Sequence, residues 1–495
     1  MSGVLRPAIT STCPPVAAIT GCILIHILTA KEKWSYATGN IPFAVKDAAF
    51  VNFVVFYYTQ VQGLSGTLAG LAMFIALVWD GVSDPVVGSW SDRLRTRWGR
   101  RHPLMVAGGI PTAILFLALF QPPEGLVEIQ LFAWLLLVSI LLRTFLTIYF
   151  IPYAAMGAEL STDYDERTVI AKARVSIAWL AGMLLPALGF ILFFAPVEGV
   201  DGRMIADNYI GYGIMSAVVA LVSAIVCIVG TRSVIPRLPQ AGEGQVFNWK
   251  QPFLDMLAAC SNRNFRISLG ANLAFGMSAG VYTTLALYLG TYFWEFSTDQ
   301  LAALVIPTAI ATLLTFTLLN RLGQRFDKPT LLAGASILLA LNACWFIGGR
   351  LLGILPDNDH PAIYYLQCLN TGVGVAMIVT LQVLSVSLAA DILDELELAT
   401  GERKEGVIFA ASAFVGKATT GAGALLAGVA IDLSGISPGD QMGTVPDNIL
   451  QSLGWFTLIL TSGLALVAFF FNTRLRLGRA DHERVKSQLE QNRSV

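Results

Sequence analysis

Apolar stretches of about twenty residues recur along the whole chain and are separated by short polar connections. A helix of about twenty apolar residues is long enough to cross the hydrocarbon core of a bilayer. Counted in this way, the chain has about twelve spans, with approximate centres near residues 50, 77, 112, 142, 183, 219, 277, 310, 340, 379, 419 and 460. The pattern therefore predicts an all-α membrane protein.

An internal repeat divides these spans into two sets of six. The basic stretch 91–103, which follows the second span, has a weaker copy at 320–329, which follows the eighth. Transporters that rock one bundle of helices against another are commonly built from such repeats. The expected organisation is a leader at 1–30, a first six-helix bundle at 31–231, a central connection at 232–264, a second six-helix bundle at 265–473 and a tail at 474–495.

Charged residues cluster where several spans end on one side of the predicted membrane. Glu159 follows the fourth span, and its counterparts in the repeat are Asp391 and Asp394 after the tenth. We expect these clusters to form a cytoplasmic gate whose ion pairs break as the bundles rock; the alternative is solvated loop charge that only fixes the topology. The expected gate residues are Asp92, Arg93, Arg100, Arg101, Glu159, Asp391 and Asp394.

Lysine and arginine are concentrated in alternate connections. The connection after the second span holds five arginines, whereas those at 121–128 and 356–361 are neutral or acidic. Because short cytoplasmic connections are enriched in positive charge, both termini are expected in the cytoplasm. Residues 1–30 lack the basic start and cleavage site of a secretory signal, so a loose or surface-lying leader, or a short extra span, is expected there. Cytoplasmic termini and the lack of a convincing targeting leader together favour a bacterial inner membrane as the location.

Composition supports the membrane assignment. Hydrophobic residues make up 55% of the chain, charged residues make up 13%, and the mean hydropathy is +0.65. A soluble domain carries about a quarter charged residues. The net charge of -1 leaves no basic excess for binding nucleic acid. The six cysteines are scattered, mostly inside apolar stretches, so they are expected to pack as small hydrophobic residues, and no metal site or cofactor is expected.

Asp80 and Asp84 lie one helical turn apart inside the apolar second span. A carboxylate at the centre of a bilayer costs about 2.5–3.5 kcal/mol on insertion scales. Two carboxylates on one helix face are therefore expected to meet water, a cation or a counter-charge. We interpret this pair as an ion site.

A membrane enzyme or a receptor fits the pattern less well than a transporter does. The four histidines, His26, His102, His360 and His482, are isolated, and no metal-ligand, Walker-type or Cys-x-x-Cys motif occurs in the sequence. A receptor would be favoured by a large soluble domain, and the chain shows no stretch that predicts one.

Four short motifs resemble those of the glycoside-pentoside-hexuronide:cation symporters, a family of the major facilitator superfamily. They are Lys46-Asp47 in the first span, Asp80-x-x-Ser83-Asp84-Pro85-x-x-Gly88 in the second, Ile151-Pro152-Tyr153 in the fourth and Gly416-Lys417 in the eleventh. The likeness covers the chain from about Trp34 to Arg474. It implies the major facilitator fold, with twelve transmembrane helices in two pseudo-symmetric six-helix bundles, in a protein that functions as a single chain.

The resemblance also implies a cation site. Residues that match Asp80, Ser83, Asp84 and Thr147 bind the coupling cation in the family, and the residue that matches Lys417 neutralises the carboxylates when the cation is absent. Oxygen ligands of this kind suit sodium, and a desolvated carboxylate pair could equally hold a proton. Ser83 replaces the asparagine of the family's best-known member, which leaves the choice between Na+ and H+ open.

For the substrate, the resemblance assigns Asp47 to hydroxyl groups and places Arg174 beside it. The second sugar-binding carboxylate of the best-known member falls at Phe150, and its stacking tryptophan falls at Ala154, so the same galactoside clamp is not expected. Arg143 lies seven residues before Phe150, on roughly the same helix face. It is expected either to bind an anionic substrate such as a hexuronide or to pair with a carboxylate such as Asp47.

The expected function is cation-coupled symport of a sugar, glycoside or hexuronide-like solute. The family also contains animal carriers of lysolipids, which use apolar side chains where sugar carriers use polar ones. Phe150 and Ala154 keep a lysolipid or another amphipathic anion as an alternative. Arg143, Thr144, Thr147 and Tyr149 leave the fourth span polar enough for a hydrophilic ligand.

Overall fold

In a computed structural model of the chain, the described residues are 28–161, 163–197, 199–238, 259–401 and 405–494. Most of the expected leader and most of the expected central connection lie outside these residues. The described part of the chain is built from helices and the connections between them. This confirms the all-α prediction.

Eleven helices of the described residues are long and apolar enough to cross a membrane. They contain the eleven predicted centres from residue 77 to residue 460. The first half of the chain forms α1 (Ala30–Thr38), α2 (Ile41–Ala49), η1 (Phe50–Val54), η2 (Tyr57–Val61), α3 (Gly66–Arg93), α4 (His102–Leu119), α5 (Glu128–Glu159), α6 (Tyr164–Leu192), η3 (Gly202–Met204), α7 (Ala206–Gly230) and η4 (Arg232–Arg237). The second half forms α9 (Arg263–Tyr288), η5 (Leu289–Phe293), α10 (Thr298–Ala303), α11 (Val305–Arg325), α12 (Lys328–Ala343), η6 (Cys344–Gly348), α13 (Gly349–Leu351), α14 (Ala362–Thr400), α15 (Glu405–Ser434), α16 (Asp447–Asn472) and α17 (Arg479–Ser494).

The predicted first span, centred near residue 50, consists of four consecutive pieces, α1, α2, η1 and η2. Pro42 lies in the first turn of α2, where its missing N–H is tolerated and where it prevents α1 from continuing. Gly39 lies at the break, and a Cβ atom there would come within 2.5 Å of the Tyr153 ring. The break therefore lets the first span approach α5 closely.

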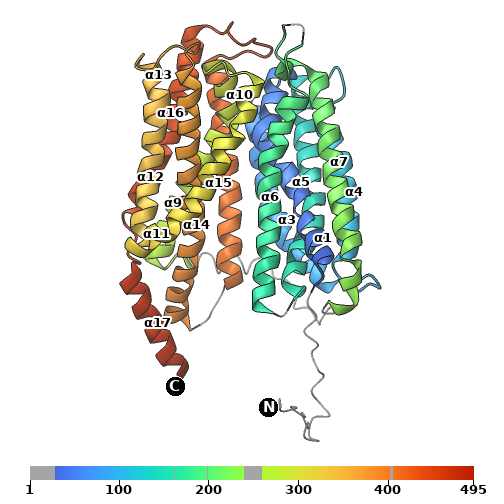
Figure 1. Cartoon of the computed structure of the whole chain (residues 1–495), viewed down its shortest axis with the longest axis vertical. Coiled ribbons are helices and arrows are strands. Elements are labelled where there is room, and N and C mark those ends of the chain that lie inside the picture. The colour runs from blue at the N-terminus through green and yellow to red at the C-terminus, as the bar shows by residue number, and fades with distance from the viewer. Residues whose placement is uncertain (1–27, 162, 198, 239–258, 402–404, 495) are drawn as a thin grey trace, which may run out of the picture.

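The helices form two bundles that stand side by side (Figure 1). One bundle contains α1 to α7 and the other contains α9 to α16. The start of α1 and the tail helix α17 lie at the same end of the molecule, which we call the terminal end. The opposite end, where α3 and α14 begin, is called the far end.

Hydrogen bonds join the two bundles at the far end. The Asp432 carboxylate of α15 accepts from the backbone N–H groups of Gly66 and Thr67, at 2.6 and 2.8 Å, and so caps the first turn of α3. The Tyr292 hydroxyl donates to Gln60 Oε1 at 2.8 Å. Unpaired N–H groups at the start of a helix need an acceptor. In α3 the Ser65 hydroxyl accepts from the Leu68 N–H at 3.3 Å, and the other bundle supplies the acceptor for the N–H groups of Gly66 and Thr67.

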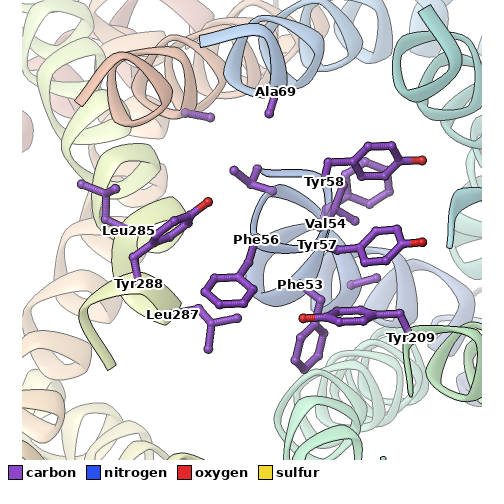
Figure 2. Close-up of a cluster of buried hydrophobic side chains, with 14 of the residues drawn as sticks. Phe53, Val54, Phe56, Tyr57, Tyr58, Ala69, Tyr209, Leu285, Leu287 and Tyr288 are labelled. Atoms are coloured by element: carbon purple, nitrogen blue, oxygen red, sulfur yellow. The ribbon is translucent and has the colours of Figure 1, made fainter. Parts of the chain in front are cut away.

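Aromatic side chains fill the space behind these bonds (Figure 2). Phe56 of the first span lies edge-on to Tyr288 of α9, with ring centroids 5.1 Å apart. Tyr57 packs against Tyr209 at 4.6 Å and donates its hydroxyl proton to the Phe120 carbonyl at 3.0 Å. Such pairs add about 0.5–1.5 kcal/mol each beyond the burial of their area. The far end is therefore a packed contact between the bundles.

The backbones of α3 and α15 touch at the same end. A Cβ atom on Gly428 would lie 2.1 Å from the Gly66 carbonyl oxygen, and one on Gly70 would lie 2.7 Å from the Ala424 carbonyl oxygen. Small residues allow this kind of close packing between helices in a membrane.

The substitution Asp432→Ala tests the far-end contact. The substitution removes the acceptor for two α3 N–H groups. We therefore expect the free energy that favours the closed far end over the open one to fall by about 0.5–2 kcal/mol, the usual cost of losing a helix cap. Distances between spin labels at positions 127 and 354, which are exposed connections of the two halves at the far end, would lengthen. The control is Asp357→Ala, since the Asp357 side chain is 99% exposed at the same end and pairs with Arg350 of its own half. Equal distances in Asp432→Ala and the parent protein would contradict the role of the cap.

Candidate functional site

The two carboxylates of α3 face α5 and α15 in the middle of the molecule. Asp80 and Asp84 are four residues apart, and so are Arg143 and Thr147 of α5, so each pair lies on one helix face. The Lys417 ammonium of α15 lies between the carboxylates, with Nζ 2.6 Å from Asp84 Oδ2 and 3.1 Å from Asp80 Oδ2. Five residues from three helices and both bundles thus meet at one point.

The Thr147 hydroxyl lies between the same two carboxylates. Its Oγ1 atom is 3.2 Å from Asp80 Oδ1 and 3.1 Å from Asp84 Oδ1. Since a hydroxyl has one proton, it can donate to only one carboxylate at a time. The Ser83 hydroxyl instead donates to the backbone carbonyl of Asp80 at 3.2 Å. The structure therefore brings Thr147 to the carboxylates and leaves Ser83 bonded to its own helix.

The charges of this cluster balance, because two carboxylates meet one ammonium and one guanidinium. The side chain of Asp80 is 8% exposed, whereas those of Asp84 and Lys417 are 30% and 24% exposed. Taking charges out of water costs several kcal/mol per ion unless each is paired. The Asp84 and Lys417 side of the cluster thus faces open space, while the Asp80 side is closed.

Arg143 binds Asp80, with Nη1 3.3 Å from Asp80 Oδ2, and its guanidinium lies over the Phe50 ring at 4.7 Å. From the sequence, Arg143 was expected to bind an anionic substrate or to pair with a carboxylate such as Asp47. In the structure Asp47 instead binds its neighbour Lys46 at 2.5 Å, and the Asp47 side chain is 51% exposed. The Lys46 ammonium also lies over the Phe43 ring, 4.1 Å from its centroid.

Arg174 and Phe150 lie apart from the carboxylate cluster, in an aromatic group of the first bundle. Phe150 stacks on Phe43, with centroids 4.5 Å apart, and lies 5.9 Å from the Tyr153 ring. Arg174 of α6 lies beside Tyr36 and Tyr153, and its Nε atom is buried without a hydrogen-bond partner among the described residues. The structure thus places Phe150 and Arg174 in this aromatic group, whereas Arg143, also predicted for the substrate, lies among the predicted cation residues.

The expected gate residues form two clusters at the terminal end. Arg101 binds both Asp92, at 2.8 Å, and Glu159, at 2.5 Å, and Arg100 binds Glu159 at 2.8 Å. In the second bundle Asp391 binds Lys328 at 2.5 Å and lies 3.7 Å from His482 of α17.

Each of these contacts joins residues of the same half of the chain. Arg93 and Asp394 have interaction partners of their own. Lys328 and His482 were missed as partners of Asp391, although Lys328 belongs to the stretch 320–329, the weaker copy of the basic stretch 91–103. A latch between the bundles remains a prediction for another arrangement of the two halves.

The sequence also missed a cavity in the second bundle, of about 570 Å³, between α9, α14 and α15. Its wall includes Gly416 and Thr420, which flank Lys417. The polar part of the wall comes from amides and hydroxyls and includes Asn272, Gln382, Ser385 and Ser412, without a charged side chain. The amides of Asn272 and Gln382, each in an apolar span, could have indicated this cavity, because polar groups are costly in a membrane.

Gln382 and Ser385 have no hydrogen-bond partner among the described residues. On the same helix the Thr380 hydroxyl bonds back to the Ala376 carbonyl at 2.8 Å, the usual arrangement for hydroxyls in apolar helices. Gln382 and Ser385 are therefore available to a ligand or to water. No group of three or more His, Cys, Asp or Glu side chains placed to hold a metal occurs in the described part of the chain.

The family model of the MFS/sugar transport proteins matches residues 35–479 of the chain. The putative glycoside/cation symporter YagG of Escherichia coli (strain K12) is 24% identical over 390 residues, which cover 78% of this chain and 79% of that protein. The sodium-dependent lysophosphatidylcholine symporter 1 of Mus musculus is 30% identical over 171 residues, 32% of this chain and 31% of that protein.

The fold is similar to that of solved transporters. A crystal structure of the nucleoside transporter NupG superposes with a TM-score of 0.62 at 12% identity, covering 90% of this chain and 98% of that one. The family match extends over nearly all of the membrane-spanning helices. The chain therefore belongs to the MFS/sugar transport protein family of the major facilitator superfamily, and it is a membrane transporter, not an enzyme.

Proposed function

We propose that the protein is a cation-coupled symporter that carries a sugar or glycoside by alternating access. The observation that carries this proposal is the Lys417 ammonium, which lies between Asp80 and Asp84 and bridges the two bundles. A monovalent cation bound there would meet carboxylate oxygens and the Thr147 hydroxyl, which are the hard oxygen ligands that sodium prefers. A proton can use the same carboxylates, so the coupling ion is Na+ or H+.

Exchange of Lys417 for the cation would couple binding to movement. When the cation replaces the ammonium, the ion pair that joins α15 to α3 is broken, and the contact between the bundles changes. A cation that raises the affinity for the substrate must have its own affinity raised by the substrate by the same factor. The substrate and the cation would therefore bind and cross together.

The packed far end and the partly open carboxylate site are consistent with a state open toward the terminal end. We assign that end to the cytoplasm, because the arginine-rich connection after α3 lies there. Both termini would then be cytoplasmic. The relative from Escherichia coli supports a bacterial inner membrane. We propose that the protein functions as a monomer.

The sugar assignment is supported by the polar groups of both bundles. The exposed Asp47 carboxylate can accept hydrogen bonds from sugar hydroxyls, and Arg174 has a buried Nε atom without a partner among the described residues. The cavity of the second bundle is large enough for a drug-sized ligand, and its free Gln382 and Ser385 groups suit an uncharged, hydroxylated solute. A related protein is named a putative glycoside/cation symporter.

A lysolipid is the second candidate. Phe150 stands where the sugar carriers of the resembled family have a carboxylate, and it stacks on Phe43 to form an apolar pair. The partial match to the mouse lysophosphatidylcholine symporter supports this alternative. The free amide and hydroxyl of the cavity favour the sugar, since an acyl chain would leave both groups without a partner.

Uptake into vesicles tests the function. Labelled neutral sugars, hexuronides and lysophosphatidylcholine are offered while sodium and proton gradients are imposed separately. We expect accumulation of a sugar or glycoside that depends on one of the two gradients. Asp84→Asn should remove this gradient dependence, because it deletes the carboxylate 2.6 Å from Lys417. If only the lysolipid accumulates, the second candidate is correct; if Asp84→Asn keeps the full gradient dependence, the cation site is elsewhere.

A pair of substitutions on α14 tests the cavity. Ala389 lines the cavity of the second bundle, whereas its neighbour Ala390 is exposed and does not line it. Ala389→Phe should lower uptake of the accumulated solute about tenfold or more, the effect of losing roughly 1.4 kcal/mol of binding. Ala390→Phe adds the same group to the same helix and should leave uptake near the parent level. Equal effects of the two substitutions would show that the cavity is not part of the substrate path.

A further inference from the structure

We propose that Arg143 is the permanent counter-charge of Asp80, so that Asp84 alone exchanges Lys417 for the coupling cation. The proposal rests on the proposed cation coupling and divides the two carboxylates, which the resemblance treats alike, into different roles. Asp80 would hold the site together, and Asp84 would bind the arriving cation.

Asp80 contacts two cations in the structure, because the Lys417 ammonium lies 3.1 Å from the same Oδ2 atom that Arg143 binds. Of these two contacts, the one with Arg143 has the surroundings of a fixed ion pair. The Asp80 side chain is 8% exposed, and that of Arg143 is 4% exposed. The guanidinium is held between Asp80 Oδ2, at 3.3 Å, and the face of the Phe50 ring, at 4.7 Å. Arginine stays protonated in proteins, and its Nε atom is buried here without a partner among the described residues. Arg143 therefore has no open route to water and cannot lose its charge.

The surroundings of Asp84 are those of an exchangeable ion pair. Its side chain is 30% exposed, and the cation that binds it is the 24% exposed Lys417, at 2.6 Å. Lys417 is the more exposed of the two cations at the site, with 24% of its side chain exposed against 4% for Arg143. Gly416 and Thr420, near it on α15, line the cavity. Lys417 can therefore swing away while Arg143 stays in place.

The charge balance gives the direction of the exchange. The remaining cation near Asp80 is Lys46, which is paired with Asp47 at 2.5 Å. When Lys417 leaves, Asp80 keeps Arg143 as its partner and only Asp84 is left as an uncompensated carboxylate. An arriving monovalent cation then restores the balance at Asp84 and has little to gain at Asp80, because opposite charges already meet there.

Two double variants with the same net charge separate the roles. Asp80→Asn with Arg143→Gln removes the fixed pair as a unit, and Asp84→Asn with Arg143→Gln removes the exchangeable carboxylate while leaving Asp80 opposite Lys417. Both variants keep one carboxylate and one ammonium at the site, so they differ only in which carboxylate remains. This makes each the control for the other.

The first readout is the ratio of uptake with and without the cation gradient, for the solute that the parent protein accumulates. In the Asp80→Asn, Arg143→Gln variant this ratio should stay within about threefold of the parent ratio, even where absolute uptake falls. In the Asp84→Asn, Arg143→Gln variant it should fall to one. Loss of the ratio in both variants, or the reverse pattern, would mean that Asp80 is itself a cation ligand and would overturn the proposal.

The second readout is independent of transport and uses thermal unfolding of the purified protein in choline chloride. Arg143→Gln alone should lower Tm by several degrees, because it leaves the buried Asp80 with a shared partner. Adding Asp80→Asn should restore most of that loss, and adding Asp84→Asn should restore clearly less. Equal restoration would mean that Arg143 serves both carboxylates alike. If the parent protein shows no gradient-driven uptake, the proposed function fails, while this comparison still decides the pairing.

Discussion

The ion pair between Lys417 and the α3 carboxylates is the contact on which the rest of this structure depends. It lies in the middle of the membrane-spanning region, and it joins a helix of the second bundle to a helix of the first. A charge at this depth is costly unless it is paired. Asp80 also pairs with Arg143 of its own bundle, so Asp84 and Lys417 are the charges that depend most on the contact between the halves. On the proposed function, a cation that replaced the ammonium would act on that contact directly.

The two ends of the molecule are held by different forces. At the far end the bundles meet through backbone groups, hydroxyls and aromatic rings, as in the Asp432 cap on α3 and the edge-on pair of Phe56 and Tyr288. At the terminal end, the ion pairs of the charged clusters tie together helices of one half, as Arg101 ties α3 to α5 through Asp92 and Glu159. The far-end contact also contains charged groups, since the buried Arg203 pairs with Asp201 and donates to the Thr291 hydroxyl of the other bundle at 2.9 Å. The bonds at the far end therefore cross between the bundles, whereas those of the two clusters stay within one half.

The sequence predicted the spans because their signal is local. A run of apolar residues and the spacing of four between Asp80 and Asp84 both follow from helix geometry and need no knowledge of neighbours. The first span was the least regular of them, since Gly39 and Pro42 break it into shorter pieces. Which side chain faces which is not local. Spacing placed Arg143 on a definite face of α5, but only the packing of α5 against α3 made Asp80 its partner and left Asp47 to Lys46.

The cavity of the second bundle also depends on packing between helices, which the sequence does not show. Asn272 and Gln382 were visible as single amides in apolar helices, but a lone amide in such a helix can equally bond to its own backbone or to a neighbour. Their role depends on the space between α14, α9 and α15, which is a property of three helices at once.

Gly416 and Thr420, in the wall of that cavity, lie near Lys417 on the same helix. A solute bound there would press on the helix that carries the exchangeable charge, so one helix, α15, can sense both the solute and the cation. On the proposed function, coupling would need no long relay of side chains, because the solute and the cation would act on adjacent turns of one helix.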